Sequence, residues 1–111
     1  MRLNITARHF KLSESLRTFT EEEVQRLKKY YDGIIDIEVI LGWEKIHRTA
    51  EINISVHGTL LTAQERSDDL KRAINSAVDK LERQLLKYKE RLRKVEHEKL
   101  MDESPSIENE M

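Results

Sequence analysis

The spacing of apolar residues changes three times along the chain, and these changes constrain the fold most strongly. Apolar and polar residues alternate over residues 3–7, apolar residues recur every three or four positions over 14–31, and alternation returns over 35–41 and 50–56. From Asp68 onward the helical spacing resumes. A period of two indicates a strand with one buried face, and a period near 3.6 indicates a helix. The sequence therefore predicts strands separated and followed by two helices.

The first helical segment, residues 14–31, has signals at both ends. Ser13 can cap its start, because the hydroxyl accepts a hydrogen bond from an otherwise unpaired amide, and Glu14 suits the positive end of the helix dipole. Asp32 and Gly33 end the pattern. We expect Gly33 to adopt a left-handed cap conformation.

The middle of the chain predicts a meander of strands. Residues 42–48 connect two clean strands and carry the only tryptophan, and residues 57–59 predict a short hairpin loop. Leu61 and Ala63 then mark a fourth, weaker strand. We predict an α+β domain of order β-α-β-β-β-α, with a four-stranded sheet and both helices packed on one face.

The second helical segment is longer than the sheet that it covers. Its stripe spans about 28 residues, or about 42 Å, whereas the strands hold about five to eight residues each. We expect the last turns to overhang the domain or to contact a partner. The stripe consists of Leu70, Ile74, Ala77, Val78, Leu81, Leu85, Tyr88, Leu92 and Val95.

Charge divides the chain into a basic body and an acidic tail. The formal net charge is −1, but residues 1–96 hold 19 Lys/Arg against 16 Asp/Glu, and residues 97–111 hold one Lys against five Asp/Glu. We expect a folded domain over residues 1–96 and an acidic tail over 97–111 that is too poor in apolar residues to order itself.

The second helix carries its positive charge in one line. Five basic residues fall within an arc of about 80° beside the apolar stripe. We call them the cationic ridge: Lys80, Arg83, Lys87, Arg91 and Lys94. Lys89 and Arg93 add charge outside the arc, and only Glu82 and Glu90 oppose it within residues 80–94. A mixture of arginine and lysine suits contacts with a phosphate backbone rather than sequence-specific recognition of bases.

Two ordinary explanations compete with a polyanion site. Long exposed helices often carry Lys and Arg for solubility, with local pairing by acids such as Glu82. The stripe from Leu81 to Val95 also resembles a coiled-coil seam, although it holds fewer than three heptads.

Catalytic and metal-binding patterns are not recognisable in the sequence. There is no cysteine, the four histidines at 9, 47, 57 and 97 form no metal-binding pair, and the three glycines are isolated. No run approaches the ~20 apolar residues of a membrane span. We expect a cytoplasmic protein that is not an enzyme, with no cofactor, no metal and no small-molecule substrate.

The order of the segments and several short stretches resemble one family of double-stranded-RNA-binding-like fold. The stretches "LNIT", "LSESLR", "RLKKYYD", "HGTLLTA" and "DDLKRAINSAVDKLERQLLKYKERL" are similar to those of the short ribosome hibernation-promoting factors and the related ribosome-associated inhibitor. The resemblance covers nearly all of residues 1–94. It departs from the family at Lys71, where many members carry an aromatic residue.

The resemblance implies a stress or stationary-phase protein that binds the small ribosomal subunit and its RNA in the decoding channel, where it inhibits translation by occluding the sites of transfer and messenger RNA. The basic positions carried over from the family are Arg17, Arg26 and Lys29 in the first helix and Lys80, Arg83 and Lys87 in the second. Lys89, Arg91 and Lys94 continue the positive surface on physical grounds.

Two other functions remain open at this stage. A protein-interaction module would dock through the overhanging apolar seam and depend on Leu92 and Val95. A general binder of double-stranded RNA would bind free duplex RNA as well as ribosomes.

Overall fold

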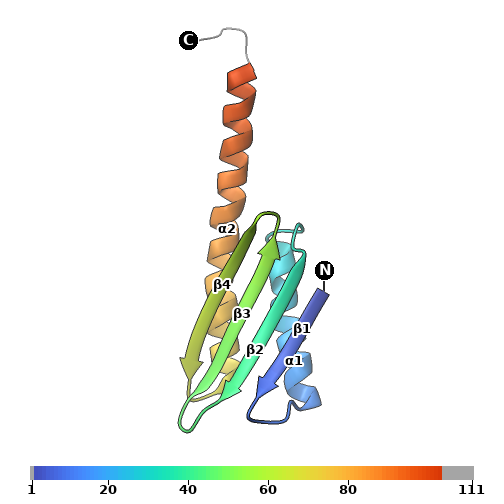
Figure 1. Ribbon diagram of the computed structural model, residues 1–111, viewed down its shortest axis with the longest axis vertical. Coiled ribbons are helices and arrows are strands. Elements are labelled where there is room, and N and C mark those ends of the chain that lie inside the picture. Colours follow the sequence, from blue (N-terminus) through green and yellow to red (C-terminus); the bar gives the residue numbers. More distant parts are fainter. Residues whose placement is uncertain (1, 104–111) are drawn as a thin grey trace.

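A four-stranded sheet with two helices behind it forms the domain (Figure 1). The computed structural model describes residues 2–103, and for residues 95–103 it describes the backbone alone. The elements are β1 (Arg2–Arg8), α1 (Glu14–Gln25), the 3-10 helix η1 (Arg26–Lys29), β2 (Asp36–Trp43), β3 (Arg48–Val56), β4 (Thr59–Ser67) and α2 (Leu70–Glu103). The predicted α+β class and the order β-α-β-β-β-α are confirmed.

The strands lie in the order β1-β2-β3-β4. β1 is parallel to β2, and the other pairs are antiparallel, as expected of a meander after the first helix. The register aligns apolar residues across the sheet: Ile5 pairs with Val39, Val39 with Ile52 and Ile52 with Ala63. This row lies on the face that the helices cover, so one face of the sheet is buried and the other is polar.

The first helix begins as expected and ends differently. The Ser13 hydroxyl accepts a hydrogen bond from the Leu16 amide at 3.2 Å, which confirms the cap. From Arg26 the chain tightens into η1, where the Tyr30 amide donates to the Leu27 carbonyl at 3.1 Å. The expected left-handed cap at Gly33 is wrong: within residues 2–103, positive φ occurs only at His9 and Gly58. The tighter last turn satisfies the end of the helix without it.

The hairpin between β3 and β4 turns through His57 and Gly58. Gly58 has φ 74°, a conformation that glycine adopts without steric cost. β4 is not the weak strand that the sequence indicates, because its nine residues pair with the full length of β3. After Leu61 and Ala63 the inward-facing positions are Glu65 and Ser67, which are polar, and for this reason the apolar pattern understates its length.

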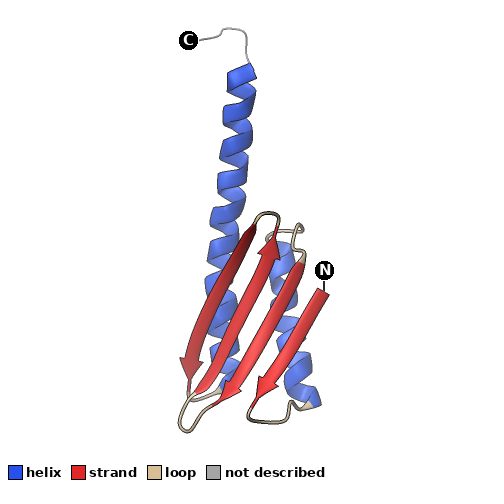
Figure 2. Cartoon of the chain, viewed as in Figure 1, coloured by secondary structure: helices blue, strands red, loops and turns tan. Residues whose placement is uncertain are grey.

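The core lies between the sheet and α2, which covers β3 and β4 (Figures 1 and 2). Tyr88 is the last buried residue of α2 among those described. Its ring meets Tyr31 edge to face at a centroid distance of 5.4 Å, and its hydroxyl donates to the His57 carbonyl at 3.1 Å. Tyr88 thus fixes α2 to the loop after η1 and to the β3–β4 hairpin at once.

The last turns of α2 project past the end of the sheet, as the length comparison predicts (Figure 2). With 34 residues, α2 is about 51 Å long, against about 30 Å for a nine-residue strand. It continues to Glu103, so it includes the first seven residues of the acidic segment 97–111. Residues 104–111, on which the expected disorder of the tail depends, lie outside the described residues.

Candidate nucleic-acid interface

One flank of α2 lies along the outer edge of β4. The Gln84 amide donates to the Thr62 carbonyl at 2.9 Å, and the Lys80 ammonium pairs with the Glu65 carboxylate at 2.5 Å. These contacts fix the rotation of α2 about its own axis. The side of the helix that carries the cationic ridge therefore faces the β4 edge and the solvent.

The ridge beyond Lys80 borders a groove of about 390 Å³. Leu61 lies on the β4 side of this groove, and the helix contributes Gln84, Lys87, Glu90, Arg91 and Lys94. Arg83, Lys87, Arg91 and Lys94 are all exposed. None of these four forms an ion pair with any side chain that the structure describes. The structure therefore brings the five ridge residues together and leaves four of them available to an external anion.

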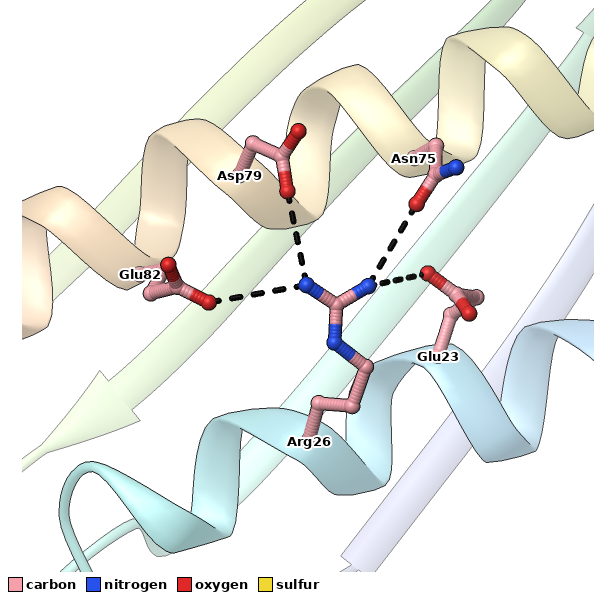
Figure 3. Close-up of polar contacts among 5 residues, drawn as sticks. All are labelled: Glu23, Arg26, Asn75, Asp79 and Glu82. Carbon is pink, nitrogen blue, oxygen red and sulfur yellow. Dashed lines mark hydrogen bonds and ion pairs between the residues drawn. The ribbon is translucent and has the colours of Figure 1, made fainter.

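The opposite flank of α2 has a different character, because it engages Arg26 of the first helix (Figure 3). The Arg26 guanidinium lies 2.7 Å from the Glu23 carboxylate and 3.5 Å from the carboxylates of both Asp79 and Glu82. It also donates to the side-chain oxygen of Asn75 at 3.4 Å. Arg26 thus links α1 and α2 across their interface, and its positive charge is already compensated by three acids.

The charges of this cluster shift the pKa values of Arg26 and Tyr30. Partial desolvation lowers the pKa of Arg26 and is the largest single influence on it, but Glu23, Asp79 and Glu82 together raise it above its usual value. Interaction with Glu82 is the main cause that raises the pKa of Tyr30, followed by burial. One Glu82 oxygen is buried and has no hydrogen-bond partner in the described part of the chain. The cluster therefore holds a surplus of negative charge between the helices.

The remaining predicted cations lie apart from the ridge. Arg17 lies near the start of α1 and Lys29 at the end of η1, and both are exposed. Lys89 lies about 180° around the helix from Lys80, on the side that faces away from β4. The flank of α2 that faces Arg26 carries the acids Asp79 and Glu82 and not the ridge cations.

Lys71, where the family resemblance leads one to expect an aromatic residue, has an aromatic neighbour instead. Its ammonium lies 5.2 Å from the centre of the Phe19 ring of α1. A cation over an aromatic face is attracted by the ring quadrupole. The lysine therefore helps to hold the start of α2 against α1.

The apolar stripe of α2, which resembles a coiled-coil seam in the sequence, belongs mostly to the core of the domain. Leu81 and Leu85 are fully buried and Tyr88 is 6% exposed, all within the domain. Leu92 is 38% exposed, and the side chain of Val95 lies outside the described residues. Most of the stripe thus packs on the chain's own sheet rather than remaining available to a partner helix.

The open face of the sheet offers a second hollow, of about 570 Å³, with mixed charge. Arg8, His9 and Arg66 line it together with the acids Glu44, Glu51 and Glu65. Three carboxylates make it a poor place for a phosphate. Among the described residues no group of three or more His, Cys, Asp or Glu could hold a metal ion, and no helix is long and apolar enough to cross a membrane.

The acidic flank of α2 is the part of the site that sequence reasoning missed. Its signal was present, since Asn75, Asp79 and Glu82 follow one another at steps of four and three and so lie on one side of the helix. The spacing predicts an acidic flank on the second helix, but not that Arg26 of the first helix meets it.

Comparison with known proteins places the chain among proteins of similar length and fold. The family described as "Sigma 54 modulation protein / S30EA ribosomal protein" matches residues 3–93. The chain belongs to this family. The ribosome hibernation promoting factor of Escherichia coli K12 is a relative with 36% identity over 93 residues, which is 84% of this chain and 98% of that protein. The factor of the same name from Azotobacter vinelandii is 34% identical over 91 residues, or 82% of this chain and 85% of the relative.

Solved structures of the family have the same fold. The ribosomal subunit interface protein from Coxiella burnetii superposes with a TM-score of 0.76 at 31% identity, covering 80% of this chain and 98% of that one. The N-terminal domain of Protein Y from Thermus thermophilus gives 0.74 at 30% identity, covering 79% and 99%. The family that the sequence resemblance indicated is thus confirmed, and so is the prediction that the chain is not an enzyme, because the named members are hibernation factors.

Proposed function

We propose that this protein is a ribosome hibernation factor that binds ribosomal RNA of the small subunit through the cationic ridge. It acts in the cytoplasm during stress or stationary phase and occludes the sites of transfer and messenger RNA in the decoding channel. The observation that carries the proposal is the line of exposed cations on the β4 flank of α2, of which Arg83, Lys87, Arg91 and Lys94 pair with no acid among the described side chains. The names of the relatives support ribosome association.

Rigidity of the ridge supports the same function. Lys80 and Gln84 tie the helix to β4, and Tyr88 ties it to the hairpin and to the loop after η1. Because the helix backbone is held on the sheet, the cations at its surface need little ordering when they meet a phosphate backbone. Binding by preorganised charge suits a factor that recognises the shape of folded RNA.

Co-sedimentation with purified small subunits tests the proposal. Arg83→Glu combined with Lys87→Glu should lower affinity roughly 100-fold, because two phosphate contacts become repulsive. Lys28→Glu combined with Arg66→Glu is the matched control: it changes the net charge equally at exposed positions away from the ridge. Equal loss in both variants would show that overall charge, and not the ridge, governs binding.

Salt dependence gives an independent test of phosphate contact. The logarithm of the binding constant should fall linearly with the logarithm of salt concentration, with a slope reduced by about one unit for each ridge cation removed. A flat dependence, together with sensitivity to Leu92→Ala, would favour the protein-interaction module instead. Equal affinity for a free RNA duplex would favour a general double-stranded-RNA binder.

A further inference from the structure

We propose that the end of the domain opposite the overhang binds an unstacked base of single-stranded RNA, through an aromatic platform built around Trp43. The proposal rests on the proposed function in that RNA is the ligand, but it concerns a separate surface. In Figure 1 the loop after β1 and the loop after β2 both lie at the lower end, whereas α2 projects from the upper end.

Three side chains form the platform. The Arg48 guanidinium lies 3.6 Å from the centre of the Trp43 ring, and the Phe10 ring lies 5.5 Å from it with an interplanar angle of 42°. Trp43 nevertheless remains 46% exposed, and the neighbouring Ile46 is 76% exposed. A large aromatic ring held in place but left open to solvent can stack with a nucleobase.

The backbone around the platform is arranged to hold it. His9 has φ 71°, an uncommon conformation for a residue other than glycine, and it turns the chain after β1 so that Phe10 meets Trp43. Arg48, paired with Trp43 in the sheet register, donates to the carbonyls of Glu44 at 2.8 Å and His47 at 3.2 Å. One arginine therefore both stacks on the ring and closes the β2–β3 loop.

The charge of these two loops favours an anionic occupant at Trp43 itself, rather than in the adjoining hollow, where Glu51 and Glu65 add negative charge. Residues 8–11 and 43–48 contain four Lys/Arg and two His against one acid, Glu44. Exposed aromatic and aliphatic groups set among cations fit a base joined to phosphates better than they fit an apolar protein surface. With the ridge on one side and this platform at the lower end, two separate RNA contacts would fix the orientation of the domain.

Trp43 is the only tryptophan, so its fluorescence reports directly on the platform. The Arg83→Glu, Lys87→Glu protein is titrated at low salt with single-stranded hexa-adenylate RNA, and separately with inorganic polyphosphate of similar charge. Stacking predicts that the RNA quenches the fluorescence and that polyphosphate does not. Equal quenching by both, or quenching by neither, would overturn the proposal.

Variants of the platform provide the second measurement, with dye-labelled hexa-adenylate followed by anisotropy. Trp43→Ala should weaken binding about 5- to 150-fold, whereas Trp43→Phe should retain most of it, because either aromatic ring can stack. Circular dichroism checks that both variants fold. Unchanged RNA affinity in Trp43→Ala contradicts the proposal. Leu60→Ser, a change at an exposed apolar residue beside the β3–β4 hairpin, is the control and should leave RNA affinity unchanged.

Ribosome binding separates this proposal from the function on which it rests. If Arg83→Glu with Lys87→Glu fails to reduce ribosome binding but hexa-adenylate still quenches Trp43, the ridge is wrong and the platform stands. If Trp43→Ala weakens ribosome binding while hexa-adenylate affinity stays the same, the platform contacts a ribosomal protein, and the proposal fails.

Discussion

The two flanks of α2 both carry charged side chains, yet they use them in opposite ways. On the flank toward α1, Asp79 and Glu82 face Arg26, and the charges are compensated inside the domain. On the flank along β4, Lys87 and Arg91 border an open groove and meet no acid among the described side chains. The position of a cation relative to the packed elements, and not its residue type, decides whether it is available to RNA.

The largest expected effect is on ribosome affinity, which should depend strongly on the flank along β4 and little on the flank toward α1. Changing Arg83, Lys87 and Arg91 together to Glu should weaken binding about 1000-fold or more, because every altered side chain is exposed and uncompensated. Arg26→Gln should weaken it less than about threefold, since the guanidinium is already engaged. Binding curves with labelled small subunits measure both. A loss in Arg26→Gln as great as that of the triple variant would contradict the comparison and restore Arg26 as an RNA contact.

The free energy of unfolding should instead depend more on the flank toward α1 than on the flank along β4. Arg26→Leu leaves three carboxylates facing one another, and we expect the free energy of unfolding to fall by about 1 kcal/mol, since the site is partly exposed and screened. Urea unfolding measures this change. Adding Glu82→Gln to that variant should recover part of the loss by removing one of the repelling charges. No recovery in the double variant would mean that Arg26 acts through packing alone.

A smaller change should come from the one ridge cation with an internal partner. Lys80 pairs with Glu65, so Glu65→Gln releases its ammonium and should strengthen ribosome binding about two- to fivefold. The free energy of unfolding should change by less than about 1 kcal/mol. Glu51→Gln, on the open face of the sheet, is the matched control. Weaker binding in Glu65→Gln would show that the pair positions Lys80 instead of restraining it.

The smallest expected effect concerns the far edge of the sheet, where the Arg2 guanidinium lies 2.8 Å from the Asp36 carboxylate. This hydrogen bond lowers the pKa of Asp36 below its usual value of 3.8. A lowered pKa in the folded state stabilises the fold above that usual value, and the contribution is lost as pH falls through the folded-state pKa. The stability difference between the natural chain and Arg2→Ala should therefore shrink on acidification below about pH 4. A carboxyl titration of Asp36 by NMR checks the direction.

The sequence predicted the architecture well because the fold depends on periodicity, which is local. Ser13 capped its helix as expected, and the overhang of α2 followed from the number of residues in its stripe. The length of β4 was underestimated because its inward-facing positions beyond Ala63 are Glu65 and Ser67, which carry no apolar signal. Gly33 was misjudged because the chain ends the helix in the 3-10 turn of η1 instead of the expected cap.

The site was less predictable because it depends on which residues of two distant segments meet. Helical geometry placed the ridge correctly along one line of α2. It could not show that Arg26, on another helix, would meet Glu82, or that Lys80 would reach Glu65 across the edge of β4. Phe10, Trp43 and Arg48 likewise come together only through the pairing of β2 with β3 and the turn at His9.

Because α2 continues without a break past Tyr88, the number of residues after Tyr88 sets the direction in which each later side chain points about the helix axis. Each residue of an α-helix advances the direction of its side chain by about 100°. One residue inserted after Tyr88 would move Arg91 to the position that Leu92 now holds, on the side of the helix that continues the apolar stripe, although the domain itself would be untouched. Substitutions in the projecting turns change only single charges, whereas an insertion or deletion there changes the direction of every side chain that follows it.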